Sequence, residues 1–236
     1  MANPTITTYD VNPLLIFKQA ISVLKTIAED ASGVIPAGAV LGEITLGAAS
    51  SAAKSGGNTG NGTLVLDATD PVLSGAKVGV YTVRCIIAGT HIAKFEVADP
   101  DGNIIGHVEF SGTGSSQTFA NQIKFEVTDG STDFVVGDGF DITIAAGSGK
   151  LVRCDSTALD GSQYPKYVIP GTADATGGDL ASVSVVKYGF AIRSKLVFTG
   201  SETLATKVDG KTMEDWLHGR GIYTVDATAF DGLDNS

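Results

Sequence analysis

Short strand-length segments separated by turn residues dominate the middle of the chain. Each is rich in β-branched or aromatic residues and is bounded by Gly, Asp, Asn or Pro, the pattern typical of β-strands. One pair, AKFEVAD and NIIGHVEF, flanks Asp-Pro-Asp-Gly and predicts a hairpin. About six such strands in succession predict a compact Ig-like β-sandwich over residues 61–146. The segments are GTLVLDA, GVYTVRCII, AKFEVAD, NIIGHVEF, NQIKFEVTD and FDITIA.

The aromatic residues of this region fall within the predicted strands. We expect them to form the core, since strand aromatics usually pack inward. A platform of exposed rings for binding carbohydrate is the alternative. The residues concerned are Tyr81, Phe95, Phe110, Phe125 and Phe140.

The flanking sequence also favours strands and turns. GVIPAGAVLGEITLG (33–47) predicts a short strand, a turn at Pro36–Gly38 and a second strand over 39–46. Residues 48–62 are small, polar and glycine-rich, which favours a linker. Further strands are predicted from 150 to 198. KTMEDWLHGRGIY predicts a short helix with Met213, Trp216 and Leu217 on one face.

Two structures are compatible with the segment NPLLIFKQAISVLKTIAED. Asn12 can cap a helix that begins at Pro13, and apolar residues follow at helical spacing. Alternatively, ISVLKTIA is a strand with Ile21, Val23 and Ile27 on one face, although Lys25 shares that face. The residues alone leave both structures open.

The stretch AAGSGKLVRC (145–154) superficially resembles a phosphate-binding loop. The motif requires a glycine five residues before the Gly-Lys glycine and Ser or Thr after the lysine. Here those positions hold Ile144 and Leu151, and no helical pattern follows. The stretch therefore predicts a flexible turn.

Composition excludes several functions. Lys and Arg total 16 and Asp and Glu total 26, which leaves a net charge of −10. Such a chain lacks the basic surface that nucleic acids and anionic membranes require. The N-terminus lacks the features of a signal peptide, and no apolar run reaches the length of a membrane span. Cys85 and Cys154 match no metal-binding spacing, so we expect two reduced, packed thiols in a protein made in the cytoplasm.

No catalytic or metal-binding motif emerges. The three histidines, His91, His107 and His218, belong to no hydrolase or zinc motif. DPDGNIIGHVEF differs from a calcium loop because its glycine comes at the fourth position and Phe110 replaces the final glutamate. We therefore expect no enzyme activity, no cofactor and no metal. A hydrolase with a triad assembled from distant residues is a remote alternative.

Several motifs, in their order along the chain, resemble the head decoration proteins of lambda-like tailed bacteriophages. They are GVIPAGAVLGEIT, SGKLVRCDSTALDGSQYPKYVI, DATGGDLASVSVVKYGFAIRSKLVF and GRGIYTV. The middle unit resembles a β module inserted in the longer members. AAGSGKL would then be the point where the chain leaves the module and re-enters the decoration domain. The resemblance spans most of residues 21–225.

The resemblance implies a mainly β fold: a small β-tulip-like barrel with a short helix, carrying an inserted sandwich. It implies a capsid-binding arm at 1–32, a discontinuous decoration domain at 33–60 and 147–236, and the module at 61–146. Residues 21–28 would be extended. The protein would bind the major capsid protein on the outside of an expanded head, as a homotrimer at threefold and quasi-threefold sites, and stabilise the head against DNA pressure. An adhesin or carbohydrate-binding module carried on the particle is the alternative.

The resemblance also nominates residues. The arm's capsid contacts would be Ile6, Tyr9, Val11, Leu15, Phe17, Ile21 and Val23. The motif residues are Pro36, Gly38, Leu41, Gly42, Asp160, Gly161, Gly177, Gly178, Asp179, Gly221, Ile222 and Tyr223.

Overall fold

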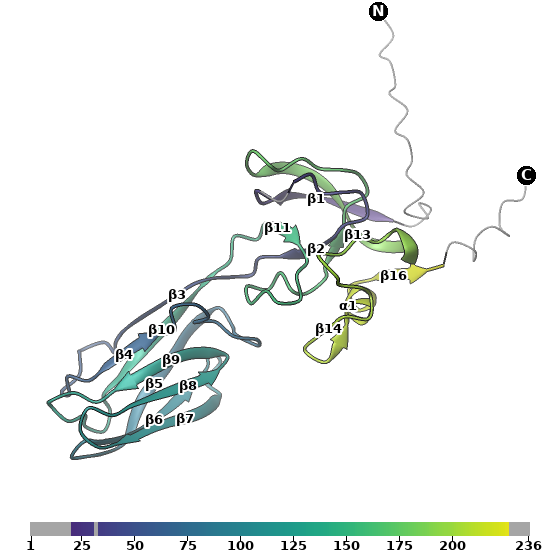
Figure 1. The fold of residues 1–236 in the computed structure, drawn as a ribbon. Coiled ribbons are helices and arrows are strands. Elements are labelled where there is room, and N and C mark those ends of the chain that lie inside the picture. The colour runs from purple at the N-terminus through teal and green to yellow at the C-terminus, as the bar shows by residue number, and fades with distance from the viewer. Residues whose placement is uncertain (1–19, 31–32, 227–236) are drawn as a thin grey trace, which may run out of the picture. The chain divides into compact units, whose positions relative to one another are not determined.

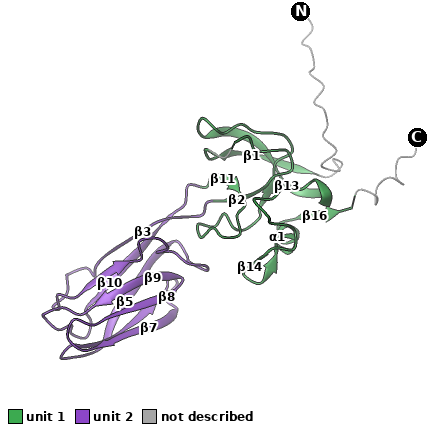
Figure 2. Ribbon diagram, in the orientation of Figure 1, with its two compact units in different colours: residues 1–43, 149–236 green, residues 44–148 purple. Residues whose placement is uncertain are grey.

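The computed structural model describes residues 20–30 and 33–226 of the chain. These residues form two compact units (Figures 1 and 2). The barrel unit comprises the described residues up to Glu43 and from Gly149 onward, and the sandwich unit comprises Ile44–Ser148. Each unit has a hydrophobic core of its own. The fold is mainly β, as the sequence predicts.

In the barrel unit, five strands close on themselves in the order β1-β11-β2-β12-β13, because β1 also pairs with β13. A sixth strand, β16, extends this sheet beside β13. The bounds are β1 (Ile21–Ile27), β2 (Val40–Glu43), β11 (Leu151–Arg153), β12 (Tyr167–Val168), β13 (Leu180–Ile192) and β16 (Ile222–Val225). The remaining elements are the 3-10 helix η2 (Arg193–Lys195), the two-stranded pair β14 (Lys207–Val208) and β15 (Lys211–Thr212), and the helix α1 (Met213–Gly219).

Strand β1 resolves the ambiguity before residue 30 in favour of the extended form. It pairs antiparallel with β13 from Ile21 to Ile27. Ile27 is fully buried and Val23 packs against the barrel core, whereas Ile21 is 57% exposed. The other proposed arm contacts, Ile6, Tyr9, Val11, Leu15 and Phe17, lie outside the described residues, as does the alternative helix at 13–20.

The helix α1 confirms the prediction over KTMEDWL. Thr212 caps it in a reciprocal arrangement: its hydroxyl accepts the N–H of Asp215, whose carboxylate accepts the N–H of Thr212. Met213 and Leu217 are buried, and the indole N–H of half-buried Trp216 donates to the carbonyl of Val208. The helix thereby ties the β14–β15 pair to the barrel core.

The sandwich unit consists of two antiparallel sheets around one aromatic core. The predicted core aromatics are all buried, at most 6% exposed, and Phe95 lies at their centre against Phe110, Phe134 and Phe140. The first sheet has the order β3 (Leu46–Ala53), β10 (Gly139–Ala146), β5 (Gly79–Gly89), β6 (Ile92–Ala98) and β7 (Ile104–Ser111). The second has the order β4 (Thr63–Leu66), β9 (Ile123–Thr128) and β8 (Ser116–Asn121).

The predicted linker at 48–62 is wrong over its first half. Residues 46–53 form β3, which pairs with β10 from Leu46↔Ala146 to Ala53↔Phe140. Its Ala and Ser side chains bury little surface, so no alternation marks the strand, and the backbone ladder with β10 holds it. The boundary of the sandwich therefore lies at Ile44 and not at residue 61.

Topologically, the sandwich unit is an insertion between two neighbouring barrel strands. β2 ends at Glu43 and β11 begins at Leu151, and these two residues are register partners. Within the sandwich unit, the Gly147 N–H donates to the carbonyl of Thr45, and a Cβ at Gly147 would lie 2.4 Å from the carbonyl oxygen of Ile44. Gly147 of AAGSGKL thus allows close approach of the backbone at Ile44, whereas Gly149 adopts a positive φ of +69°.

If Asp-Pro-Asp-Gly alone formed the turn of the hairpin β6–β7, Ala98 would pair with Asn103 and His107 would face Lys94. The observed register is different. Ala98 instead pairs with Ile104 across an irregularity, so His107 faces Glu96 and not Lys94. The cause is Asp99, whose Oδ1 accepts the backbone N–H groups of both Asp101 and Asn103. The turn therefore takes one more residue than the two-strand pattern predicts.

Acid should weaken the sandwich unit through Asp99. A hydrogen bond from Lys77 at 2.6 Å, together with those from Asn103, lowers the pKa of this carboxyl to about 2. A lowered folded-state pKa means that the ionised group contributes stability above its ordinary value of 3.8, and that this contribution is lost as the pH falls toward 2. Asp99→Asn should flatten that part of the stability–pH curve in denaturant titrations. Asp101→Asn, a 65% exposed side chain on the same lysine, is the control and should leave the slope unchanged.

Candidate functional site

The family-motif residues lie together in the barrel unit, where several have a clear structural role. Gly42 lies in β2, between β11 and β12. A Cβ at this position would lie 1.9 Å from the carbonyl oxygen of Ser162, which follows the Asp160–Gly161 turn. That turn is closed by Asp160 Oδ1, which accepts both the N–H and the hydroxyl of Ser162. The motif around Gly42 and the motif around Asp160 are thus two sides of one contact.

A second close contact joins the motif Gly-Ile-Tyr to β13. Gly221 has φ +86°, and a Cβ there would lie 2.5 Å from Cδ1 of Tyr188. Its carbonyl accepts the N–H of Gly189, and a Cβ on Gly189 would lie 3.0 Å from Cα of Ala20. Ile222 is fully buried. The start of β1, the middle of β13 and the start of β16 therefore meet at one place.

The remaining motif residues shape turns. Gly38, at φ +88°, donates to the carbonyl of Ile169, and the carbonyl of Pro36 accepts the N–H of Ala39. Asp179 accepts the N–H of Glu29 and pairs with Lys150, while no heavy atom lies within 4 Å of the Cβ positions of Gly177 and Gly178. Leu41 is part of the barrel core. These motif residues account for the fold of the barrel and do not form a chemical site.

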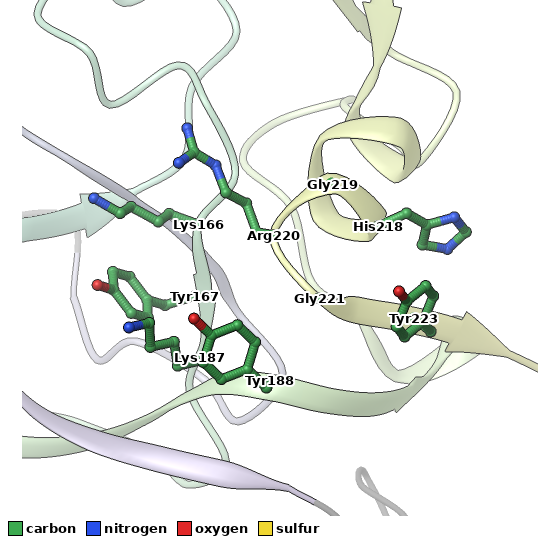
Figure 3. A pocket seen from close by; sticks show the side chains of 9 residues that line it. All are labelled: Lys166, Tyr167, Lys187, Tyr188, His218, Gly219, Arg220, Gly221 and Tyr223. Atoms are coloured by element: carbon green, nitrogen blue, oxygen red, sulfur yellow. The ribbon is translucent and has the colours of Figure 1, made fainter.

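The barrel unit carries a pocket beside this meeting point, with a volume of about 440 Å³. We call it the Lys-Tyr pocket, because two Lys-Tyr pairs, one at β12 and one on β13, line it together with the α1–β16 loop. In Figure 3, these two pairs gather on one side of the loop, and His218 and Tyr223 lie on the other. Its lining residues are Lys166, Tyr167, Lys187, Tyr188, His218, Gly219, Arg220, Gly221 and Tyr223.

The pocket is basic and aromatic, and no Asp or Glu of residues 20–30 or 33–226 lines it. Tyr188 is 41% exposed and Tyr223 is 49% exposed. The ammonium of Lys187 lies 5.0 Å from the centroid of the Tyr188 ring, and the ring of His218 lies 5.5 Å from that of Tyr223. These contacts hold the side chains over a surface that offers both cations and flat rings.

One carboxylate, Glu43, lies behind the pocket wall and serves two lysines. Lys25 donates to Glu43 at 3.0 Å, and Lys166 donates to its other oxygen. Burial opposes ionisation of Glu43, but these hydrogen bonds outweigh burial and hold the pKa of the carboxyl below its usual value. The pKa of Lys25 is raised, chiefly by its hydrogen bond to Glu43. Glu43 therefore stays charged, and each of its two carboxylate oxygens accepts a hydrogen bond from a lysine.

No serine, threonine or cysteine is among the described residues that line the pocket. His218 is its only histidine, and its Nε2 accepts the backbone N–H of Thr224 at 3.2 Å, which fixes the strand β16 to α1. The two cysteines are buried elsewhere, and burial raises the pKa of both thiols. The chemistry that the pocket offers is binding of negative charge.

A separate cluster in the sandwich unit brings together one imidazole and two carboxylates. Nδ1 of His91 lies 2.7 Å from Oδ2 of Asp129 and 3.6 Å from Oδ1 of Asp133. This set could coordinate a divalent cation. Its atoms also have protein partners, since Asp129 accepts the N–H of Gly114 and Asp133 accepts the N–H of His91. These hydrogen bonds hold three loops together, and this structural role accounts for the position of the three side chains.

Sequence reasoning did not nominate the cluster, and of the residues that line the Lys-Tyr pocket it nominated only Gly221 and Tyr223, as motif residues. The cluster is assembled from a β-turn and a loop about forty residues apart, a separation that no motif covers. The Lys-Tyr pocket had a visible signal, since the dipeptide Lys-Tyr occurs at 166–167 and again at 187–188. Only the pairing of β12 with β13 brings the two copies to one surface.

Comparison with known proteins gives little guidance. No family model and no curated protein matches the chain. Two crystal structures of Xanthomonas campestris FlgL match in part, with 20% identity over 53% of this chain and 23% over 47%, each at a TM-score of 0.29. The chain spans 33% of the FlgL chain in each case. Similarity at this level carries no argument about fold or function. Among the described residues, no helix is long and apolar enough to cross a membrane.

Proposed function

We propose that the protein is a structural component of a phage head, which binds the outer surface of the expanded capsid as trimers and stabilises it against the pressure of packaged DNA. The observation that carries the proposal is the convergence of the family motifs. Residues 33–43, 151–168, 174–179 and 219–225 are far apart in sequence but all belong to the barrel unit. The contacts of Gly42 with Ser162 and of Gly221 with Tyr188 explain why such motifs must occur together.

Strand β1 supports attachment through the N-terminal segment. On one side it pairs with β13, but on the other only Ile27 pairs, with Leu151 of β11. Within the described residues, the outer backbone edge of 21–25 therefore has no strand partner. An edge of this kind can accept or extend a strand of another protein. The 19 residues that precede Ala20 would continue from this edge to the capsid.

The sandwich unit suits the role of an outer domain. Because it is inserted between two neighbouring strands, it leaves the barrel ladder of β2 and β11 intact. Its aromatic residues are all buried, so the exposed aromatic face that a carbohydrate-binding module would use is missing from this unit. No observation therefore favours the adhesin over the capsid protein.

The copy number of the protein in particles of its source phage tests this function. Threefold decoration requires roughly one copy per capsid subunit, measured by gel densitometry against the major capsid protein. Deleting residues 1–19 should abolish binding to expanded heads, whereas Ser201→Ala, an exposed change in the barrel unit, should leave it unchanged. A few copies per particle, or none, would refute the proposal.

A further inference from the structure

We infer that the Lys-Tyr pocket binds an acidic peptide segment of a partner protein. The argument begins with charge. The whole chain carries 26 acidic and 16 basic residues, yet the described lining of the pocket holds two lysines and an arginine and no Asp or Glu. A local excess of positive charge against an acidic background creates a field that selects negative ligands.

Two of these cations lack a counterion. Among residues 20–30 and 33–226, neither Lys187 nor Arg220 forms an ion pair, and the Lys187 ammonium lies 5.0 Å from the centroid of the Tyr188 ring. Lys166 shares the single carboxylate of Glu43 with Lys25. Glu43 thus supplies one negative charge for two lysines, and Lys187 and Arg220 have no acidic partner among the described residues. A ligand that brings two or more carboxylates would complete this set.

The tyrosines favour a peptide over a small anion. The half-exposed rings of Tyr188 and Tyr223 offer apolar surface beside the cations, and their hydroxyls can donate to carboxylates or to backbone carbonyls. The pocket volume of about 440 Å³ lies within the range of known ligand-binding pockets, so it can hold a few side chains of a peptide. A segment that alternates acidic and apolar residues matches both features.

The pocket is also shaped in advance. Gly221 leaves no space between its own backbone and the Tyr188 ring, and the β13–β16 ladder fixes Phe190 against Tyr223, with ring centroids 5.8 Å apart. A rigid surface loses little conformational entropy when it binds. This inference depends on the pocket alone and holds whether or not the partner is a capsid protein.

The test measures binding of fluorescein-labelled acetyl-Glu-Leu-Glu-Leu-Glu-Leu-Glu to the full chain by fluorescence anisotropy. We expect this peptide to bind at least about tenfold more tightly than its Gln-for-Glu counterpart, and to weaken with added salt. The double variant Lys187→Glu/Arg220→Glu should weaken binding at least about tenfold. Lys195→Glu, which makes the same reversal at a single exposed lysine outside the pocket, should stay within about twofold.

Several outcomes would overturn the inference. Equal binding of the neutral peptide would remove the role of charge, and equal loss in the Lys195→Glu variant would show a nonspecific field. Inorganic phosphate that competes at the same concentration as the peptide would assign the pocket to a small anion. If the peptide binds only after residues 227–236 are deleted, the acidic C-terminal segment of the chain itself is the occupant. Circular dichroism confirms that each variant is folded.

Peptide binding and capsid decoration can fail separately. If acidic peptides bind but the protein is absent from particles, the decoration proposal is wrong, whereas the inference that the pocket binds acidic peptides is confirmed. If the protein is abundant on particles but the acidic peptide does not bind, the inference about the pocket is wrong and the decoration proposal stands.

Discussion

Gly42→Ala is expected to destabilise the barrel unit strongly while the stability of the sandwich unit stays unchanged. The new Cβ would lie 1.9 Å from the carbonyl oxygen of Ser162 and 2.7 Å from its Cα. All the atoms it meets belong to the backbone, so no side-chain rotation relieves the overlap, and β2 or the Asp160–Gly161 turn must move. Because β2 pairs with both β11 and β12, we expect a loss of about 4 kcal/mol, a large fraction of a domain's total stability.

The chain contains its own reporter for this experiment. Its only tryptophan, Trp216, packs on the barrel core, so tryptophan fluorescence follows unfolding of the barrel. The far-ultraviolet circular dichroism of the sandwich should retain its own transition, because the two units have separate cores. Gly177→Ala is the matched control: no atom lies within 4 Å of its Cβ position, and its φ is not positive. Equal midpoints for the two variants would refute the structural role of the Gly42 contact.

Sequence patterns predicted the sandwich better than the barrel, for a physical reason. In the sandwich, strands such as β6 alternate buried and exposed positions, and burial of rings such as Phe95 imposes a period that can be recognised. In the barrel, β11 has three residues and β12 has two, which is too short for any period to appear. These strands exist because their neighbours in the barrel pair with them.

The candidate site could not be derived from spacing alone. Its two Lys-Tyr pairs are visible in the sequence, but their meeting depends on the pairing of Val168 with Val186. Arg220 and Tyr223 reach the same pocket only because Gly221 turns the chain against Tyr188. Tertiary contacts of this kind leave no local signature. The glycines that make them possible are visible, although their partners are not.

The conformation of the glycine-rich stretch 54–62 likewise has no local sequence signature. Asp138 holds this stretch in place. This residue is only 3% exposed, and its carboxylate accepts the N–H groups of Thr59, Gly60 and Val135 at 2.9–3.1 Å. Although burial opposes ionisation, these three bonds hold the pKa of Asp138 below its usual value. One ionised side chain thus fastens a segment of low intrinsic order to the loop that precedes β10.

Asp138→Ala should therefore destabilise the sandwich unit by about 3 kcal/mol, because three backbone donors, of which Gly60 is buried, lose a charged acceptor. Denaturant unfolding followed by circular dichroism measures the loss, and hydrogen exchange should accelerate at Thr59 and Gly60 before it does so in the β5–β6 ladder. Asp70→Ala, an exposed carboxylate in the same unit, should change stability by less than about 0.5 kcal/mol. If exchange at Thr59 and Gly60 is unchanged in Asp138→Ala, the ladder of β3 with β10 orders this segment without the carboxylate.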